Sequence, residues 1–172
     1  KILFVYTCIT LVLFIIYKII NFRSFDAFNL AMTIISSGGF LIVNDISEVL
    51  QTNFQIYVFS LSMLVSFFGI LLPYNILFLK KKDLLVFTED YYLLVYFVFL
   101  VSIFFLFFNQ YNNFSVTLFS LVSSISNIGF SFETYNESNF IFLVLVIIGG
   151  SLFSTSSGIR FLKIFLLTKF SL

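Results

Sequence analysis

Two short stretches of small polar residues and glycine interrupt an otherwise apolar chain. The first stretch is TIISSGGF at residues 33–40, and the second stretch is SSISNIGF at residues 123–130. Glycine reaches backbone conformations outside the helix and strand regions without steric cost, so it lets successive carbonyl oxygens face one point. Such oxygens can replace the water around a monovalent cation without a fixed charge that would hold the ion too tightly. The pattern predicts a cation filter whose ligands are backbone carbonyls.

The predicted filter residues are the last four before the phenylalanine in each stretch. They are Ser36, Ser37, Gly38 and Gly39, and Ser126, Asn127, Ile128 and Gly129. We expect the apolar segments before them, residues 24–36 and 115–126, to be half-helices with their partially negative C-terminal ends toward the ion. The large phenylalanine after each stretch is expected to wedge it against the scaffold. The alternative is that the small residues serve only close packing of helices.

A third stretch, GGSLFSTSSG at residues 149–158, interrupts the last apolar run of the chain. So many small residues cannot continue an apolar helix, so we expect a break there, with the segment projecting under the filter as a gate. The predicted gate residues are Gly149, Gly150, Ser151, Ser154, Thr155, Ser156, Ser157, Gly158 and the basic Arg160.

The composition indicates which solvent these elements meet. Of the 172 residues, 60% are hydrophobic and only 10% are charged, too few to cover the surface of a soluble domain. A bilayer core takes roughly 20 apolar residues as helix. We therefore expect an all-α membrane protein, with spans at residues 2–20, 55–78, 91–108 and 139–167. The two half-helices are too short to cross, so they are expected to be re-entrant, starting at a cap of Ser24 or of Asn113 or Ser115.

Residue counts exclude several other kinds of site. The chain has one cysteine, Cys8, and no histidine, which rules out disulfides, cysteine metal sites and the commonest general base. A net charge of +1 makes nucleic acid an unexpected partner. Acidic residues fall at the ends of the apolar runs, so we expect no catalytic residues, no cofactor and no enzyme. A cation pore and a non-conducting subunit packed against a complete channel remain open.

The organisation repeats after a shift of 90 residues. The shift places residues 2–20 on 92–110 and the first stretch on the second. Basic residues end both copies, at Lys80, Lys81 and Lys82 and at Arg160, Lys163 and Lys169, so the copies are expected to be parallel. We expect two units, residues 1–82 and 83–172, each ordered helix, half-helix and loop, helix. The helix that ends the second unit is the interrupted one.

Three stretches in this order resemble the Trk/Ktr/HKT superfamily of potassium transporters, and its bacterial TrkH-type pore subunits in particular. FDAFNLAMTIISSGGF looks like the second pore helix and filter of that family, and LFSLVSSISNIGFS like the third. IIGGSLFSTSSGIRFLK resembles the glycine-rich interruption in the inner helix of the third repeat. Leu152 and Phe153 depart from the family's small residues there, and Ser156 and Ser157 stand at positions that are usually glycine.

The resemblance implies potassium uptake through a channel-like transmembrane pore, in a multi-pass protein of the inner (plasma) membrane surrounded by lipid. Potassium is then the transported ion at the filter residues, with Gly39 and Gly129 as filter glycines. Such pores have four repeats, so this chain is expected to be a fragment, a split form or a degenerate form. It would need the missing first and fourth repeats, or a second copy, to complete a ring. The family's TrkH-type members are homodimers that a cytoplasmic nucleotide-binding subunit regulates.

Overall fold

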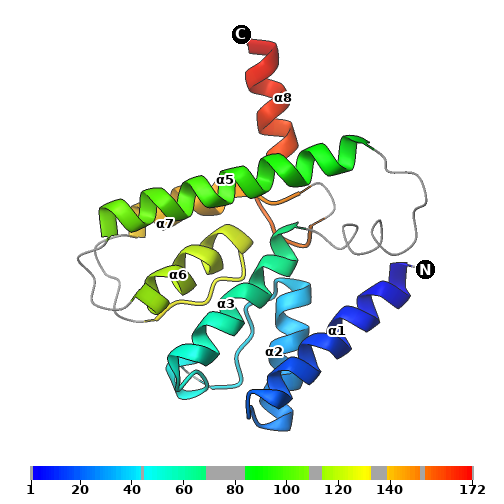
Figure 1. Cartoon of the computed structure of the whole chain (residues 1–172), viewed down its shortest axis with the longest axis vertical. Coiled ribbons are helices and arrows are strands. Elements are labelled where there is room, and N and C mark those ends of the chain that lie inside the picture. Colours follow the sequence, from blue (N-terminus) through cyan, green and yellow to red (C-terminus); the bar gives the residue numbers. More distant parts are fainter. Residues whose placement is uncertain are drawn as a thin grey trace.

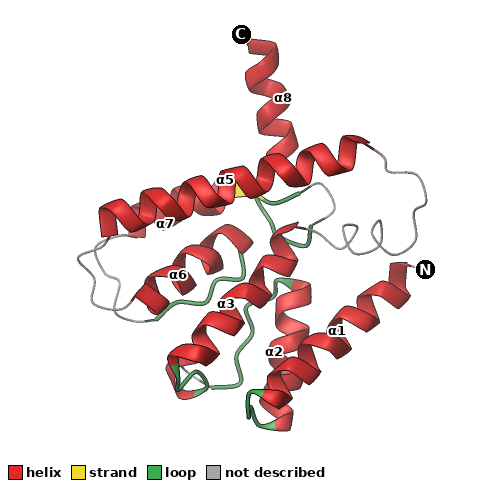
Figure 2. Cartoon of the chain, in the orientation of Figure 1, coloured by secondary structure: helices red, strands yellow, loops and turns green. Residues whose placement is uncertain are grey.

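The computed structural model describes residues 2–43, 45–68, 84–108, 114–132, 139–151 and 154–171. These residues are mostly helical (Figures 1 and 2), so the predicted all-α class is confirmed. The elements in chain order are α1 (Ile2–Ile19), α2 (Ser24–Ser36), the 3-10 helix η1 (Ile46–Glu48), α3 (Asn53–Phe68), α5 (Leu84–Phe108), α6 (Phe114–Ser126), α7 (Asn139–Ile147), β1 (Ile148–Gly149), β2 (Ile159–Arg160) and α8 (Phe161–Ser171).

The two short helices have the expected ranges but different starts. Both α2 and α6 hold 13 residues. Arg23, in extended conformation, is the residue before α2, and no side chain caps that end. Ser24 is therefore not the cap; its hydroxyl accepts a hydrogen bond from Lys18 Nζ at 2.9 Å. Ser115 lies inside α6 and donates to Asn53 Oδ1, while Asn113 lies outside the described residues.

The last apolar run is interrupted where the glycines and serines occur. Helix α7 ends at Ile147, and helix α8 begins at Phe161. Between them β1 and β2 pair in parallel, with Ile148 opposite Ile159 and Gly149 opposite Arg160. This pairing brings the two ends of the interruption side by side, and we refer to the described residues between them, 150–151 and 154–158, as the loop.

The expected membrane spans are contradicted by the structure. Among the residues that it describes, no helix combines the length and the apolar character needed to cross a membrane. The predicted transmembrane helices and the multi-pass location in the inner membrane were therefore wrong. They rested on apolar runs counted along the sequence. As folded, α3 has 16 residues and α7 has nine, fewer than the roughly 20 of a span.

Some sequence-based expectations concern residues outside the described ranges. These include Lys80, Lys81 and Lys82, the division between residues 82 and 83, and Leu152 and Phe153 in the interrupted segment.

Helix α3 organises the core because it packs against both short helices (Figure 1). Its Phe59 is completely buried and lies among three other rings. The ring centroid of Phe59 is 6.0 Å from Phe119 of α6, 5.7 Å from Phe130 in the second stretch and 5.8 Å from Tyr17 of α1. One side chain thus joins α1, α3, α6 and the second stretch.

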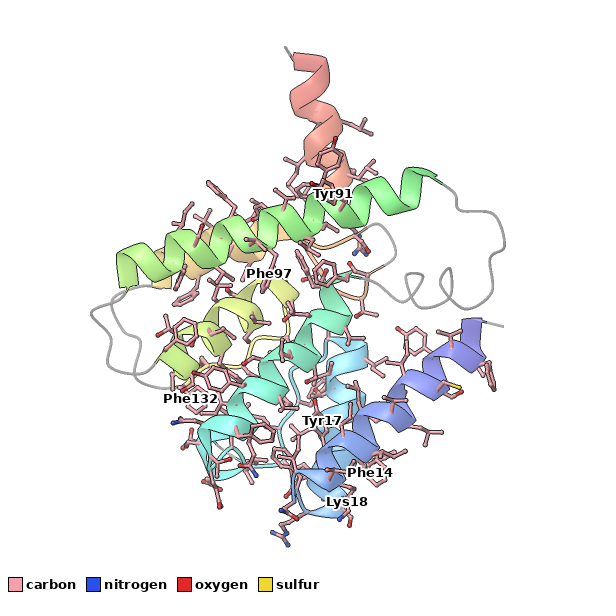
Figure 3. All side chains as sticks on the ribbon, viewed as in Figure 1. Phe14, Tyr17, Lys18, Tyr91, Phe97 and Phe132 are labelled. Carbon is pink, nitrogen blue, oxygen red and sulfur yellow. The ribbon has the colours of Figure 1, made fainter. Side chains whose placement is uncertain are left out.

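A buried polar chain accompanies this aromatic cluster. Tyr17 points from α1 toward α3 (Figure 3), where its hydroxyl bonds to Ser62 Oγ. Ser62 in turn donates to the carbonyl of Phe59 at 2.6 Å. The Tyr17 hydroxyl therefore acts as the donor to Ser62, and both hydroxyls have a hydrogen-bond partner. Burial raises the pKa of the Tyr17 phenol well above its ordinary value.

We predict that Phe59→Ala destabilises the fold by about 3–5 kcal/mol, since truncating a buried phenylalanine leaves a cavity. The matched control is Phe54→Ala on the same helix, where the ring is 64% exposed and should cost little. Chemical denaturation of both variants measures the difference. An equal loss in the two would contradict the central position of Phe59.

We also predict that stability falls at alkaline pH through Tyr17. In the unfolded chain a tyrosine ionises near pH 10, whereas burial keeps the folded phenol neutral. The contribution of the Tyr17 phenol to the free energy of unfolding is therefore complete below pH 10, and it is lost as the pH rises above that value. The difference in unfolding free energy between the wild type and Tyr17→Phe should shrink between neutral pH and pH 11. A difference that stays constant would show that the phenol ionises equally in both states.

Candidate functional site

Helix α2 ends in a hydrogen-bonded turn that reverses the chain. The amide of Ser37 donates to the Ile34 carbonyl at 3.1 Å, and the amide of Gly38 donates to the Thr33 carbonyl at 3.0 Å. Ser37 has the left-handed conformation, with φ of 50°. These are the bonds of a Schellman motif, in which the left-handed position usually holds glycine. A serine there is uncommon and directs its side chain away from the helix axis.

Helix α6 ends in the same way. The amides of Asn127 and Ile128 donate to the carbonyls of Ser124 and Ser123, each at 3.2 Å. Asn127 has the left-handed conformation, with φ of 58°. Each bond has its counterpart 90 residues earlier, so the two helix ends are equivalent in detail.

A second contact closes each turn, and sequence analysis did not identify it. Thr33 Oγ1 accepts a hydrogen bond from the amide of Phe40 at 2.9 Å. At the equivalent place, Ser123 Oγ donates to the carbonyl of Phe130 at 2.6 Å. Both bonds span seven residues and tie the end of the stretch back to the helix. The 90-residue shift aligns Thr33 with Ser123, so a shared hydroxyl at this position was the available signal.

The two stretches meet at a glycine. A Cβ placed on Gly39 would lie 2.2 Å from the carbonyl oxygen of Ile128, and Gly39 has φ of +65°. Gly129 has φ of +86°, but a Cβ there would meet nothing within 4 Å. Both positions therefore favour glycine for its backbone conformation, and Gly39 also does so because the second stretch approaches it.

The carbonyl oxygens of the predicted filter residues are the candidate ligands at the two helix ends. Within the described part of the chain, no donor hydrogen-bonds to the carbonyls of residues 36–39 or 126–129. The hydroxyls of Ser36 and Ser126 instead bond back to their own helices, to the carbonyls of Thr33 and Ser123. Among the described residues, no cluster of histidine, cysteine or carboxylate side chains could hold a metal ion, so any cation here would meet backbone oxygen.

The phenylalanines after the two stretches differ. Phe130 is buried and packs on Phe59, as the expected wedge requires. Phe40 is 79% exposed, so the wedge prediction was wrong for the first stretch. The first stretch is held by the Thr33 bond and by its contact with Ile128.

The interrupted segment contacts both stretches at equivalent positions. Ser37 Oγ lies 3.0 Å from Thr155 Oγ1, and Asn127 Nδ2 donates to the Ser157 carbonyl at 3.0 Å. Ser37 and Asn127 are the two left-handed residues that end the helices. The unusual conformation thus presents one polar side chain from each helix end to the same loop.

Arg160 holds this loop from its other side. Its Nη1 donates to the carbonyls of Ser151, Ser154 and Ser156 at 3.3, 3.0 and 2.8 Å, and to Ser154 Oγ at 2.9 Å. The guanidinium is always charged, and no described carboxylate pairs with it. The positively charged Arg160 side chain is therefore the hydrogen-bond donor for three carbonyls of the loop.

Further hydrogen bonds anchor the loop to α3 and to itself. The amide and hydroxyl of Ser151 donate to the carbonyls of Phe67 and Phe68 at 3.1 and 3.0 Å. The amide of Gly150 donates to Ser156 Oγ, which also bonds to Ser154 Oγ. Gly149 lies in β1, and Gly158 precedes β2 with φ of +90°. Ser151, Ser154 and Ser156 are therefore buried partners in hydrogen bonds, whereas Ser157 is exposed.

We predict a graded effect of alanine at the three glycines of the two stretches. Gly129→Ala should cost about 1–2 kcal/mol, the penalty of a left-handed residue with a Cβ. Gly39→Ala should cost more, because the Cβ must also displace the Ile128 carbonyl. Gly38→Ala should cost least, since its Cβ would meet mainly the exposed ring of Phe40. Thermal unfolding gives the order, and the largest loss at Gly38 would contradict the contact.

No protein-family model, no curated protein and no solved structure matches the chain. The resemblance to the Trk/Ktr/HKT superfamily therefore stays an interpretation of three stretches of sequence. Function is argued below from the geometry of the two helix ends and the loop between them.

Proposed function

We propose that the chain binds a dehydrated monovalent cation of the potassium class, with backbone carbonyls of residues 36–39 and 126–129 as ligands. The observation that carries the proposal is the pair of equivalent helix ends. Each contains a left-handed residue and a glycine with positive φ, and its four carbonyls have no donor among the described residues. Both amide-to-carbonyl bonds of one turn have their counterpart in the other turn, as two copies of one unit would have.

The local electrostatics suit a cation without binding it too tightly. The C-terminal ends of α2 and α6 each carry a partial negative charge of about half an elementary charge. Residues 36–39 and 126–129 include no carboxylate, so a bound ion would face dipoles rather than a fixed charge. Carbonyl dipoles favour ions that give up water readily, which potassium does.

In this proposal the two stretches are two of four walls of a selectivity filter in a channel-like pore. The finer architecture is two parallel units, each with a helix, a half-helix and loop, and a second helix. Two walls leave half of a bare cation exposed, so a complete ring needs further stretches from the first and fourth repeats or from a second copy. The homodimeric state and the nucleotide-binding regulator belong to the same proposal, and they rest on the resemblance alone.

The loop beneath the two stretches is proposed as the gate. Its contacts with Ser37 and Asn127 would place it across the route of an ion leaving the carbonyls. Arg160 supports this role, because its charge opposes a second cation while its hydrogen bonds hold the loop in shape.

A second candidate function is a non-conducting subunit that packs against a complete channel. The close approach of Gly39 to the Ile128 carbonyl favours it, because that oxygen then faces protein. The Ile128 side chain is also buried. In this alternative the matched helix ends serve the joining of the two units.

Titration calorimetry of the purified chain with potassium chloride, at constant ionic strength in choline chloride, distinguishes the cation-binding function from the non-conducting packing subunit. We expect saturable binding that sodium competes for weakly. Gly129→Ala should weaken it about tenfold, since about 1.4 kcal/mol of strain corresponds to a tenfold change in affinity. Phe54→Ala is the control, with wild-type affinity. A folded chain without saturable binding would favour the packing subunit.

A further inference from the structure

An apolar groove runs between α1 and α2. Leu3, Tyr6 and Leu11 line it from α1, and Phe28, Met32 and Ser36 line it from α2. Phe28 is 52% exposed and Met32 is 49% exposed. They share one face of α2 with Phe25, since residues three and four apart lie on the same side of a helix. This face leads directly to the first stretch.

The equivalent face of α6 is covered. Ten of its 13 residues are buried, against six of the 13 in α2. Helix α3 supplies the cover: Phe59 stacks on Phe119, Tyr57 lies against Phe114, and Ser115 bonds to Asn53. The second half-helix is thus enclosed by the helix that ends the preceding unit. Within the described residues, no helix takes that place on α2.

Helix α7 is the counterpart of α3 in the second unit, because it follows the second half-helix as α3 follows the first. It packs on α6, and its Phe142 lies against Phe104 of α5. Unlike α3, it covers no further half-helix among the described residues. The exposed side chains that the structure describes on α7 are apolar: Leu143, Val144, Val146 and Ile147. Among the described residues, α2 of the first unit therefore has an apolar face that no helix covers, and α7 of the second unit covers no further half-helix.

We propose that α7 of a second copy of this chain docks in the groove between α1 and α2 and repeats the packing of α3 on α6. The groove on one copy receives α7 of the other. Two copies related by a two-fold axis make this contact twice, so the interface is isologous and the dimer is closed. The proposal rests on the proposed function, because closure would bring four carbonyl stretches together.

The chemistry of the two surfaces supports a second copy as the occupant. No charged side chain lines the groove, and α7 itself contains only apolar residues after Asn139. The two surfaces thus match in polarity, and exposed apolar patches of this kind mark interaction sites. The template of the contact, α3 on α6, is present within each chain.

Disulfide trapping tests the surface directly. The bond between Asn53 and Ser115 joins α3 to α6, and the 90-residue shift places these positions at Leu143 and Phe25. In a Cys8→Ala background, Phe25→Cys with Leu143→Cys should form a disulfide-linked dimer on oxidation, with a mass twice the 19.9 kDa of the chain. The control pairs Phe25→Cys with Val98→Cys, which is 57% exposed on α5 and should give far less dimer. Equal trapping in both pairs would overturn the proposal.

Light scattering on the purified chain in nonionic detergent gives the mass without cysteines. We expect a dimer that Met32→Glu converts to a monomer and that Val98→Glu leaves intact. A monomeric wild type would overturn the docking surface, even if potassium binds. A dimer that Met32→Glu disrupts, but that binds no potassium, would support the surface and reject the proposed cation site. A dimer that Met32→Glu leaves intact would place the interface elsewhere.

Discussion

The contact between Gly39 and the carbonyl of Ile128 sets the geometry on which the site depends. A Cβ at Gly39 would come within 2.2 Å of that oxygen, so the two stretches can approach this closely only with glycine there. The approach fixes how far apart the ends of α2 and α6 can lie. Helix α3 must then fill the space between them, and its Phe59 does so by packing on α6 and on the second stretch.

Polarity within the site is divided between two sets of carbonyls. The carbonyls of the loop lie next to the positive charge of Arg160, which donates hydrogen bonds to three of them. Those of residues 36–39 and 126–129 have no donor in the described part of the chain. The molecule thus contains one set of carbonyls that a cationic side chain holds and another set without a hydrogen-bond donor among the described residues. This contrast gives the proposed cation site its physical basis.

The two halves are alike in backbone and unlike in burial. The hydrogen bonds of the helix ends match, yet Phe130 is buried and Phe40 is exposed. The difference follows from position, since α3 covers the second half-helix and nothing described covers the same face of the first. Equivalent sequences therefore meet different surroundings, and the open face of α2 is where a partner would restore the equivalence.

Local patterns in the sequence determined the ranges of the two short helices, the matched stretches and the interruption of the last apolar run. They did so because helix ends depend on nearby residues: glycines and serines stop α2 and α6, and GGSLFSTSSG stops α7. The same patterns gave a wrong account of membrane spans, since an apolar run does not report the length of the folded helix. They also missed the contact of Gly39 with Ile128 and the bond between Ser37 and Thr155, 118 residues apart. Only the tertiary structure decided these, because the donor that satisfies a carbonyl, or the atom that approaches a glycine, comes from a distant segment brought near by packing.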